Sequence, residues 1–98
     1  MLHIVNKSPS ERNTLDSVLR IAQSGSLLLI EDGVYAATRG NAAEARLTAA
    51  MARLKVYALL PDLEARAIAD RVIDGVTTIG YDGFVDLVAE HDACQSRL

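Results

Sequence analysis

Short apolar segments alternate with amphipathic ones along this chain, and the alternation predicts strands connected by helices. The clearest strand covers residues 27–31, in which four consecutive large apolar residues lead into Glu31-Asp32-Gly33. A continuous apolar run of this length is typical of a strand that is buried on both faces. Shorter segments with strand-like composition predict three more strands, at residues 2–5, 55–60 and 76–79.

Apolar residues recur at helical spacing in the segments between these strands. The first such segment predicts a helix over residues 14–24, with Asn13 as its N-cap and Gly25 as its stop signal. Asn41 and Glu44 form a second capping signature ahead of another apolar stripe, so a second helix follows them.

Two more helices are predicted in the second half of the chain. Pro61 suits the first turn of a helix, which we expect to continue to Ile68. The last helix begins near Asp82 and has Phe84, Leu87 and Val88 on one face. Strands and helices therefore alternate, and the connections are long enough to cross over between parallel strands. This order predicts an α/β fold: a single small domain over residues 1–98, with a mainly parallel four-stranded sheet and helices on both faces.

The apolar content is high for a chain of this size. Half of the 98 residues are hydrophobic, and the mean hydropathy is +0.15. A domain this short buries only about two thirds of the surface of its unfolded chain. We therefore expect another subunit to cover part of the apolar surface, with a compact monomer around an alanine-rich core as the alternative.

Charge and cysteine content narrow the classes of function. Ten basic and thirteen acidic residues give a net charge of −3, and lysine occurs only at Lys7 and Lys55, so no nucleic-acid surface is expected. The longest apolar run is too short to cross a membrane, and the first residues lack a secretion signal. The single cysteine, Cys94, agrees with a reducing compartment, so we expect a cytoplasmic protein. No motif predicts a metal or a cofactor.

Cys94 is the only soft nucleophile, and it follows His91 by three residues. An imidazole at that spacing favours a thiolate, which can carry sulfur as a persulfide. Glu90 and Asp92 oppose a thiolate because they add negative charge, and chain ends commonly fray. We therefore expect an incidental cysteine, with a persulfide carrier as the alternative, and we expect His91 to contact carbonyl groups at the end of the last helix.

Asp32 and Gly33 stand at the carboxyl end of the buried strand, where open α/β sheets usually hold ligands. A phosphoacceptor aspartate would need further carboxylates after the first strand, but residues 6–8 are Asn-Lys-Ser, and no lysine follows Lys55. We therefore expect Asp32 to cap a helix that starts at Val34, and Gly33 to form a turn that resists a Cβ if its φ is positive. A small-ligand-binding domain that uses the Asp32 loop is the alternative.

Four segments of the chain read MLHIVNKSP at residues 1–9, EDGVYAA at 31–37, LKVYAL with DLEAR within 54–66, and YDGFVDL at 81–87. In this order they resemble the DsrH/TusB family, and the similarity spans nearly the whole chain. No single segment is diagnostic. Their matching spacing makes a chance resemblance improbable.

The resemblance implies a DsrE/F/H-like fold and a non-catalytic structural subunit of a heterohexameric sulfurtransferase complex of the DsrEFH/TusBCD type. In such sulfur-relay complexes the DsrE/TusD-like subunit carries the persulfide, a TusA-like carrier supplies the sulfur, and a DsrF/TusC-like subunit is the third partner. The Tus branch serves 2-thiolation of the tRNA wobble uridine, and the Dsr branch serves dissimilatory sulfur oxidation. Dsr-branch members carry a cysteine on the first helix where this chain has Val18, and both pathways stay open. The chain alone is expected to self-associate through the surface that its partners cover.

Overall fold

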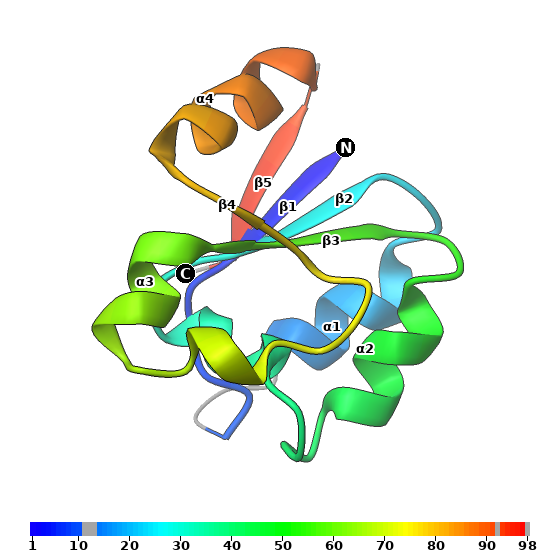
Figure 1. Cartoon of the computed structure of the whole chain (residues 1–98). Coiled ribbons are helices and arrows are strands. Elements are labelled where there is room, and N and C mark those ends of the chain that lie inside the picture. Colours follow the sequence, from blue (N-terminus) through cyan, green and yellow to red (C-terminus); the bar gives the residue numbers. More distant parts are fainter. Residues whose placement is uncertain (11–13, 92, 98) are drawn as a thin grey trace.

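A five-stranded sheet, with helices on both of its faces, forms the centre of the protein (Figure 1). The computed structural model describes residues 1–10, 14–91 and 93–97. The strand order is β4-β3-β2-β1-β5, and each pair of neighbours is parallel. The strands are β1 (Leu2–Val5), β2 (Ser26–Leu29), β3 (Lys55–Leu59), β4 (Thr77–Ile79) and β5 (Cys94–Arg97).

The fifth strand corrects the four-stranded sheet that the sequence predicts. Residues 94–97 were expected to fray, but they pair with β1, with Cys94 opposite Leu2. The backbone N–H of Leu2 donates to the carbonyl of Ala93 at 2.9 Å, which anchors the start of the strand. This edge strand is held by backbone hydrogen bonds, and its sequence, Cys-Gln-Ser-Arg, lacks the apolar pattern of a buried strand.

The helices are distributed unevenly between the two faces of the sheet (Figure 1). One face carries α1 (Thr14–Ile21), η1 (Glu31–Ala37), α2 (Glu44–Ala50), α3 (Leu60–Ala65) and η2 (Ala69–Arg71). The other face carries α4 (Tyr81–Glu90). Right-handed crossovers explain this distribution, because β1 to β4 advance in one direction across the sheet, and the chain must then return over the opposite face to place β5 beside β1.

Alternating residues of the central strands divide the core into two clusters. Val5, Leu27 and Leu29 face the layer of α1, α2 and α3, where nineteen buried apolar residues of the described chain form one cluster. Leu2 and Leu28 face α4, where the corresponding cluster contains four. β2 is thus buried on both faces, as its composition indicated. The strand ends at Leu29, however, and Glu31, which was predicted to lie in it, is exposed and begins η1.

Local signals from the sequence are confirmed only in part at the helix ends. The N-cap of α2 is Ala43, which makes no side-chain capping bond, and α1 ends at Ile21, three residues before the predicted end. Asn41 and Glu44 act on the turn that precedes α2. The amide oxygen of Asn41 accepts from the backbone N–H of Ala43 at 2.6 Å, and the Glu44 carboxylate accepts from that of Gly40 at 2.7 Å, which fixes the entrance to α2. Pro61 lies in the first turn of α3. The predicted N-cap of α1, Asn13, lies outside the described residues.

One prediction about α4 is wrong in part. Leu87 is buried and Phe84 is half-buried against the sheet, but Val88, which was expected on the same face, is exposed to 39%. The chain packs closely at the start of this helix, because a Cβ on Gly83 would lie 2.8 Å from the Cβ of Ile79 in β4. Leu87 therefore points at the sheet, and Val88, one residue further along, lies on the flank of the helix.

Candidate functional site

The loops after β2 and β3 meet at the carboxyl edge of the sheet. These two strands are parallel neighbours, with Leu29 opposite Ala58, so the segments that follow them leave the sheet side by side. On the other side of β2, the backbone N–H of Ile30 extends the pairing with β1 by donating to the carbonyl of Val5 at 3.0 Å. This is the edge at which α/β folds commonly bind ligands.

Asp32 forms an ion pair with Arg66 at this edge. The Nε and Nη2 atoms of Arg66 donate to one carboxylate oxygen of Asp32 at 3.0 and 2.9 Å. A third guanidinium nitrogen, Nη1, donates to the carbonyl of Asp62 at 3.2 Å. The side chains of Arg66 and Asp32 are 23% and 46% exposed, so the pair is partly screened by solvent.

The structure corrects the capping role expected of Asp32. The residue that precedes η1 is Ile30, whose side chain makes no capping hydrogen bond. Asp32 lies inside the first turn, one residue later than Glu31, and its carboxylate turns to Arg66. The expected capping bond is replaced by a tertiary contact with a residue 34 positions away.

Asp62 holds the backbone of Glu31 in an uncommon conformation. Glu31 has a φ of +51°, a left-handed value that costs energy for a residue with a Cβ. Its N–H donates to the Asp62 carboxylate at 2.7 Å, and a charged acceptor makes this a strong hydrogen bond. The strained loop after β2 is thus tied to the first turn of α3.

Gly33 is required by a close approach between backbones. Its φ is not positive, so the strain considered for a positive φ does not apply here. A Cβ at Gly33 would lie 2.3 Å from the carbonyl oxygen of Val5 and 3.3 Å from the Cα of Asn6. Gly33 therefore lets η1 pass directly over the end of β1.

The charged groups at this edge are occupied by one another. Asp32 and Asp62 accept hydrogen bonds from Arg66 and Glu31, and no cysteine, serine or histidine takes part in these contacts. The described residues contain no group of three or more His, Cys, Asp or Glu side chains that could hold a metal ion. The arrangement stabilises a loop, and it lacks the nucleophile and base that group transfer needs.

Cys94 lies at the opposite, amino edge of the sheet, where the parallel strands begin. It is the first residue of β5, at the amino end of a parallel strand, and its thiol is free and exposed. Its register partner, Leu2, faces α4, so Cys94 points to the same face. The structure therefore does not bring Cys94 together with Asp32 and Gly33.

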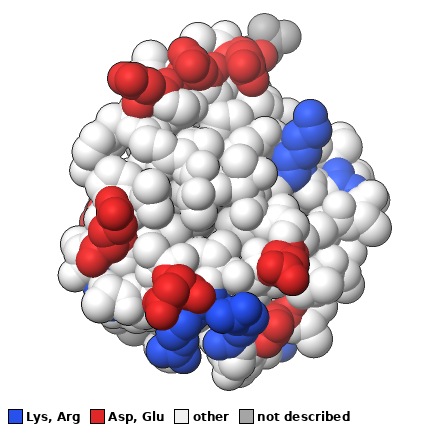
Figure 2. Space-filling model, viewed as in Figure 1, with Lys and Arg blue, Asp and Glu red and all other residues white. Residues whose placement is uncertain are grey.

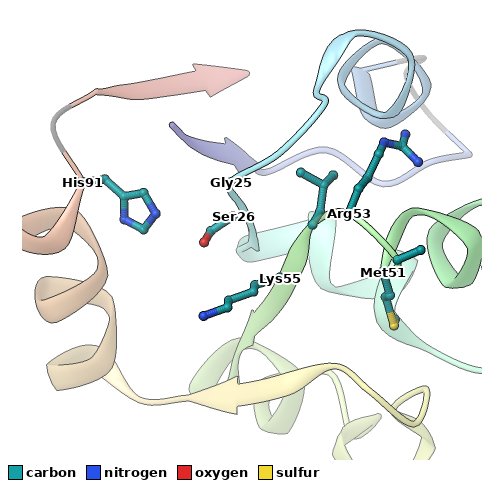
Figure 3. Close-up of a pocket in the computed structure, with 8 residues that line it drawn as sticks. Gly25, Ser26, Met51, Arg53, Lys55 and His91 are labelled. Carbon is teal, nitrogen blue, oxygen red and sulfur yellow. The ribbon is translucent and has the colours of Figure 1, made fainter.

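A shallow hollow of about 480 Å³ also lies at the amino edge (Figure 3). Ser26, Lys55 and His91 point into it, whereas Met51 and Arg53 are directed to its far side. The His91 Nδ1 atom lies 2.7 Å from the carbonyl of Leu87, which confirms the predicted contact with the end of the last helix. No hydrogen bond joins Ser26 to His91 among the contacts of the described chain, so this hollow offers positive charge without an activated nucleophile.

Sequence reasoning missed Arg66 and Asp62, although two signals could have found them. The two residues are four positions apart on a predicted helix, a spacing that brings an acid and a base together. Adjacent parallel strands also bring their following loops together, so the residues after β3 were candidates to meet Asp32.

Comparison with known proteins gives one consistent family. The family model described as "DsrH like protein" matches residues 7–94. Protein TusB of Pectobacterium atrosepticum is 41% identical over 92 residues, which cover 93% of this chain and 94% of that protein. Protein TusB of Escherichia coli O81 is 36% identical over 93 residues, which cover 95% and 96%.

Two solved structures share the fold at low sequence identity. The ychN protein from E. coli superposes with a TM-score of 0.79 at 22% identity, covering 98% of this chain and 97% of that one. A protein of unknown function from Methanobacterium thermoautotrophicum superposes with a TM-score of 0.77 at 18% identity, covering 98% and 96%. The sequence matches and the common architecture agree: this chain belongs to the DsrH-like family, together with the TusB proteins.

Proposed function

We propose that this chain is a non-catalytic structural subunit of a heterohexameric sulfur-relay complex. Its partners are TusD- and TusC-like subunits, of which the first carries the persulfide that a TusA-like protein supplies. The TusB relatives favour the Tus branch, in which the sulfur reaches the 2-position of the tRNA wobble uridine. The chain contributes binding surface to this assembly and needs no cofactor.

The observation that carries this proposal is the occupancy of the carboxyl edge of the sheet. Arg66, Asp32 and Asp62 close that edge with hydrogen bonds among themselves and with the backbone of Glu31. A relay site needs an accessible sulfur atom there, where an incoming carrier can reach it. Charged groups that bond one another at this position support a structural role.

The geometry of Cys94 supports the same proposal. A persulfide carrier needs a thiolate stabilised by nearby positive charge. Lys55 supplies such charge in the amino-edge hollow, but Cys94 is not part of its lining. It lies on an edge strand with an exposed side chain, without the enclosed surroundings that would protect a persulfide.

The test is reconstitution with separately purified TusC- and TusD-like subunits. Size-exclusion chromatography with light scattering should give one complex of defined mass, and a Cys94→Ser variant should assemble equally and relay sulfur at an unchanged rate. Mass spectrometry after incubation with a persulfide donor should show little sulfur on Cys94. Rapid stoichiometric labelling of Cys94, together with loss of relay in the serine variant, would establish a carrier instead, and a chain that ignores both partners would refute the structural role.

A further inference from the structure

Helix α4 carries apolar residues on more than the face that it buries. Leu87 is buried and Phe84 is half-buried against the sheet. Tyr81, Val85 and Val88 are nevertheless 63%, 66% and 39% exposed. These three residues are spaced at i, i+4 and i+7, so they form a single stripe along the helix, which we call the α4 stripe.

The α4 stripe stands out among the described residues. Six large apolar side chains of that part of the chain are exposed, and three of them lie on this one helix of 10 residues. The other three lie apart from one another: Met1 precedes β1, Ile21 is on α1 and Tyr35 is on η1. Single exposed apolar residues are normal on a protein surface, but a continuous stripe marks an interaction site.

The layer that contains α4 is also the thinner one. The cluster between α4 and the sheet has four buried residues, compared with nineteen on the opposite face, among the residues that the structure describes. One short helix covers this face of five strands (Figure 1). A sheet buried on both faces needs a second cover of comparable size, and a docked neighbour can add it.

A row of carboxylates borders the α4 stripe. This row contains Asp82, Asp86 and Glu90, which follow one another at four-residue spacing. It occupies a third side of α4, next to the stripe and away from the side that packs on the sheet. Figure 2 shows acidic side chains in a line along the top of the molecule, where Figure 1 places α4, with no basic side chain between them. The helix thus offers three sides: a buried one, an apolar exposed one and an acidic one.

We infer that the α4 stripe and this acidic row form the surface on which a partner subunit docks, and that the partner presents an apolar patch bordered by Lys or Arg side chains. This inference rests on the proposed function, and it names the surface that the assembly uses. Charge favours a different chain over a second copy, because two copies that meet at α4 would bring two acidic rows close together, and each copy has a net charge of −3. Tyr81 is suited to anchor such a contact, because tyrosine gives a large contact area with few rotatable bonds.

The test uses the full-length chain with purified TusC- and TusD-like subunits as probes. Val85→Asp places a carboxylate at the centre of the stripe. In the complex this charge would be buried without an opposite charge beside it, so the substitution should weaken association at least about 100-fold. Ile21→Asp is the matched control: Ile21 is 58% exposed, close to the 66% of Val85, but it lies on α1 across the sheet. The control should bind within about threefold of the wild type. Both positions are exposed, so circular dichroism should show an unchanged fold.

A second variant tests the charge of the partner. Asp86→Lys reverses one charge in the acidic row, so it should slow association about tenfold at low ionic strength and flatten the dependence of the rate on salt. Hydrogen exchange should show protection of residues 81–90 in the wild-type complex.

The outcomes separate this inference from the proposed function. If the wild type and Val85→Asp bind both partners equally, the α4 surface is wrong and the structural role stands. If the wild type binds neither partner, both are refuted. If Val85→Asp instead abolishes a homodimer of this chain and leaves the mixed complex intact, the stripe binds a second copy, and the heterologous partner is refuted.

Discussion

Substituting Gly33 by alanine tests whether the close approach of η1 to β1 is a structural requirement. The added Cβ would lie 2.3 Å from the carbonyl oxygen of Val5, where ordinary contacts begin at 3.4 Å. The neighbour is backbone, so the chain must move by about 1 Å at a tightly packed position. That displacement would also break the bond from the N–H of Ile30 to Val5, which is 3.0 Å long.

The expected loss of stability follows from these two effects. Overpacking at a rigid site costs about 1–3 kcal/mol, and the broken hydrogen bond adds about 1 kcal/mol. A loss of about 2–4 kcal/mol is large for a chain of 98 residues, whose total is on the order of 5–15 kcal/mol. Urea unfolding at low protein concentration should show the midpoint lowered by about 1–2 M.

Gly80→Ala supplies the control for this experiment. A Cβ at Gly80 meets no atom within 4 Å, and its φ of −86° is open to any residue. Gly80 precedes α4, where alanine is a weaker N-cap than glycine, so its loss should stay below about 1 kcal/mol. If Gly33→Ala unfolds at the same urea concentration as the wild type, the close approach is not a constraint, and the account of this loop is wrong.

Three other substitutions have smaller expected effects. Asp32→Asn should destabilise the chain by about 0.5–1 kcal/mol in urea unfolding, because the ion pair with Arg66 is partly exposed; a loss above 2 kcal/mol would mean that the pair is more deeply coupled. Arg53→Met removes hydrogen bonds to two carbonyls at the end of α1 and should cost about 1 kcal/mol, seen as faster hydrogen exchange in the last turn of that helix; unchanged exchange would show that water replaces the arginine. Cys94→Ser should leave the unfolding midpoint unchanged, because the thiol is exposed; a shifted midpoint would show that the thiol contributes to β5.

The sequence predicted most of the fold because most of it is determined by apolar patterns. The apolar run at 27–30 is short and ends at a turn signal, which favours a buried strand, and each amphipathic segment between strands had one face to bury. The strand at 94–97 could not be predicted in this way. It lies at the edge of the sheet and is held by pairing with the backbone of β1, a contact that depends on tertiary structure and leaves no pattern in the side chains.

The candidate site was predicted in position and mistaken in chemistry. Asp32 and Gly33 do lie at the carboxyl edge, because the end of a buried parallel strand has to be there. Local capping rules then assigned Asp32 to its nearest N–H groups. In the fold, Arg66 offers two donors to one oxygen, and this charged contact replaces the local one. The adjacency of β2 and β3 is the signal that brings Arg66 to Asp32.

Half of the exposed large apolar side chains of the described residues lie on α4. A chain that is half hydrophobic was expected to expose apolar surface to a partner, but composition carries no position. Helical periodicity came close, since it placed Val88 with Phe84 and Leu87, and the packing of α4 on the sheet then left Val88 outside. The sheet can bury only one side of a single helix, so the rest of the apolar arc stays exposed. An exposed apolar stripe on the thinner layer is what the proposed structural role predicts, because subunit interfaces bury such side chains.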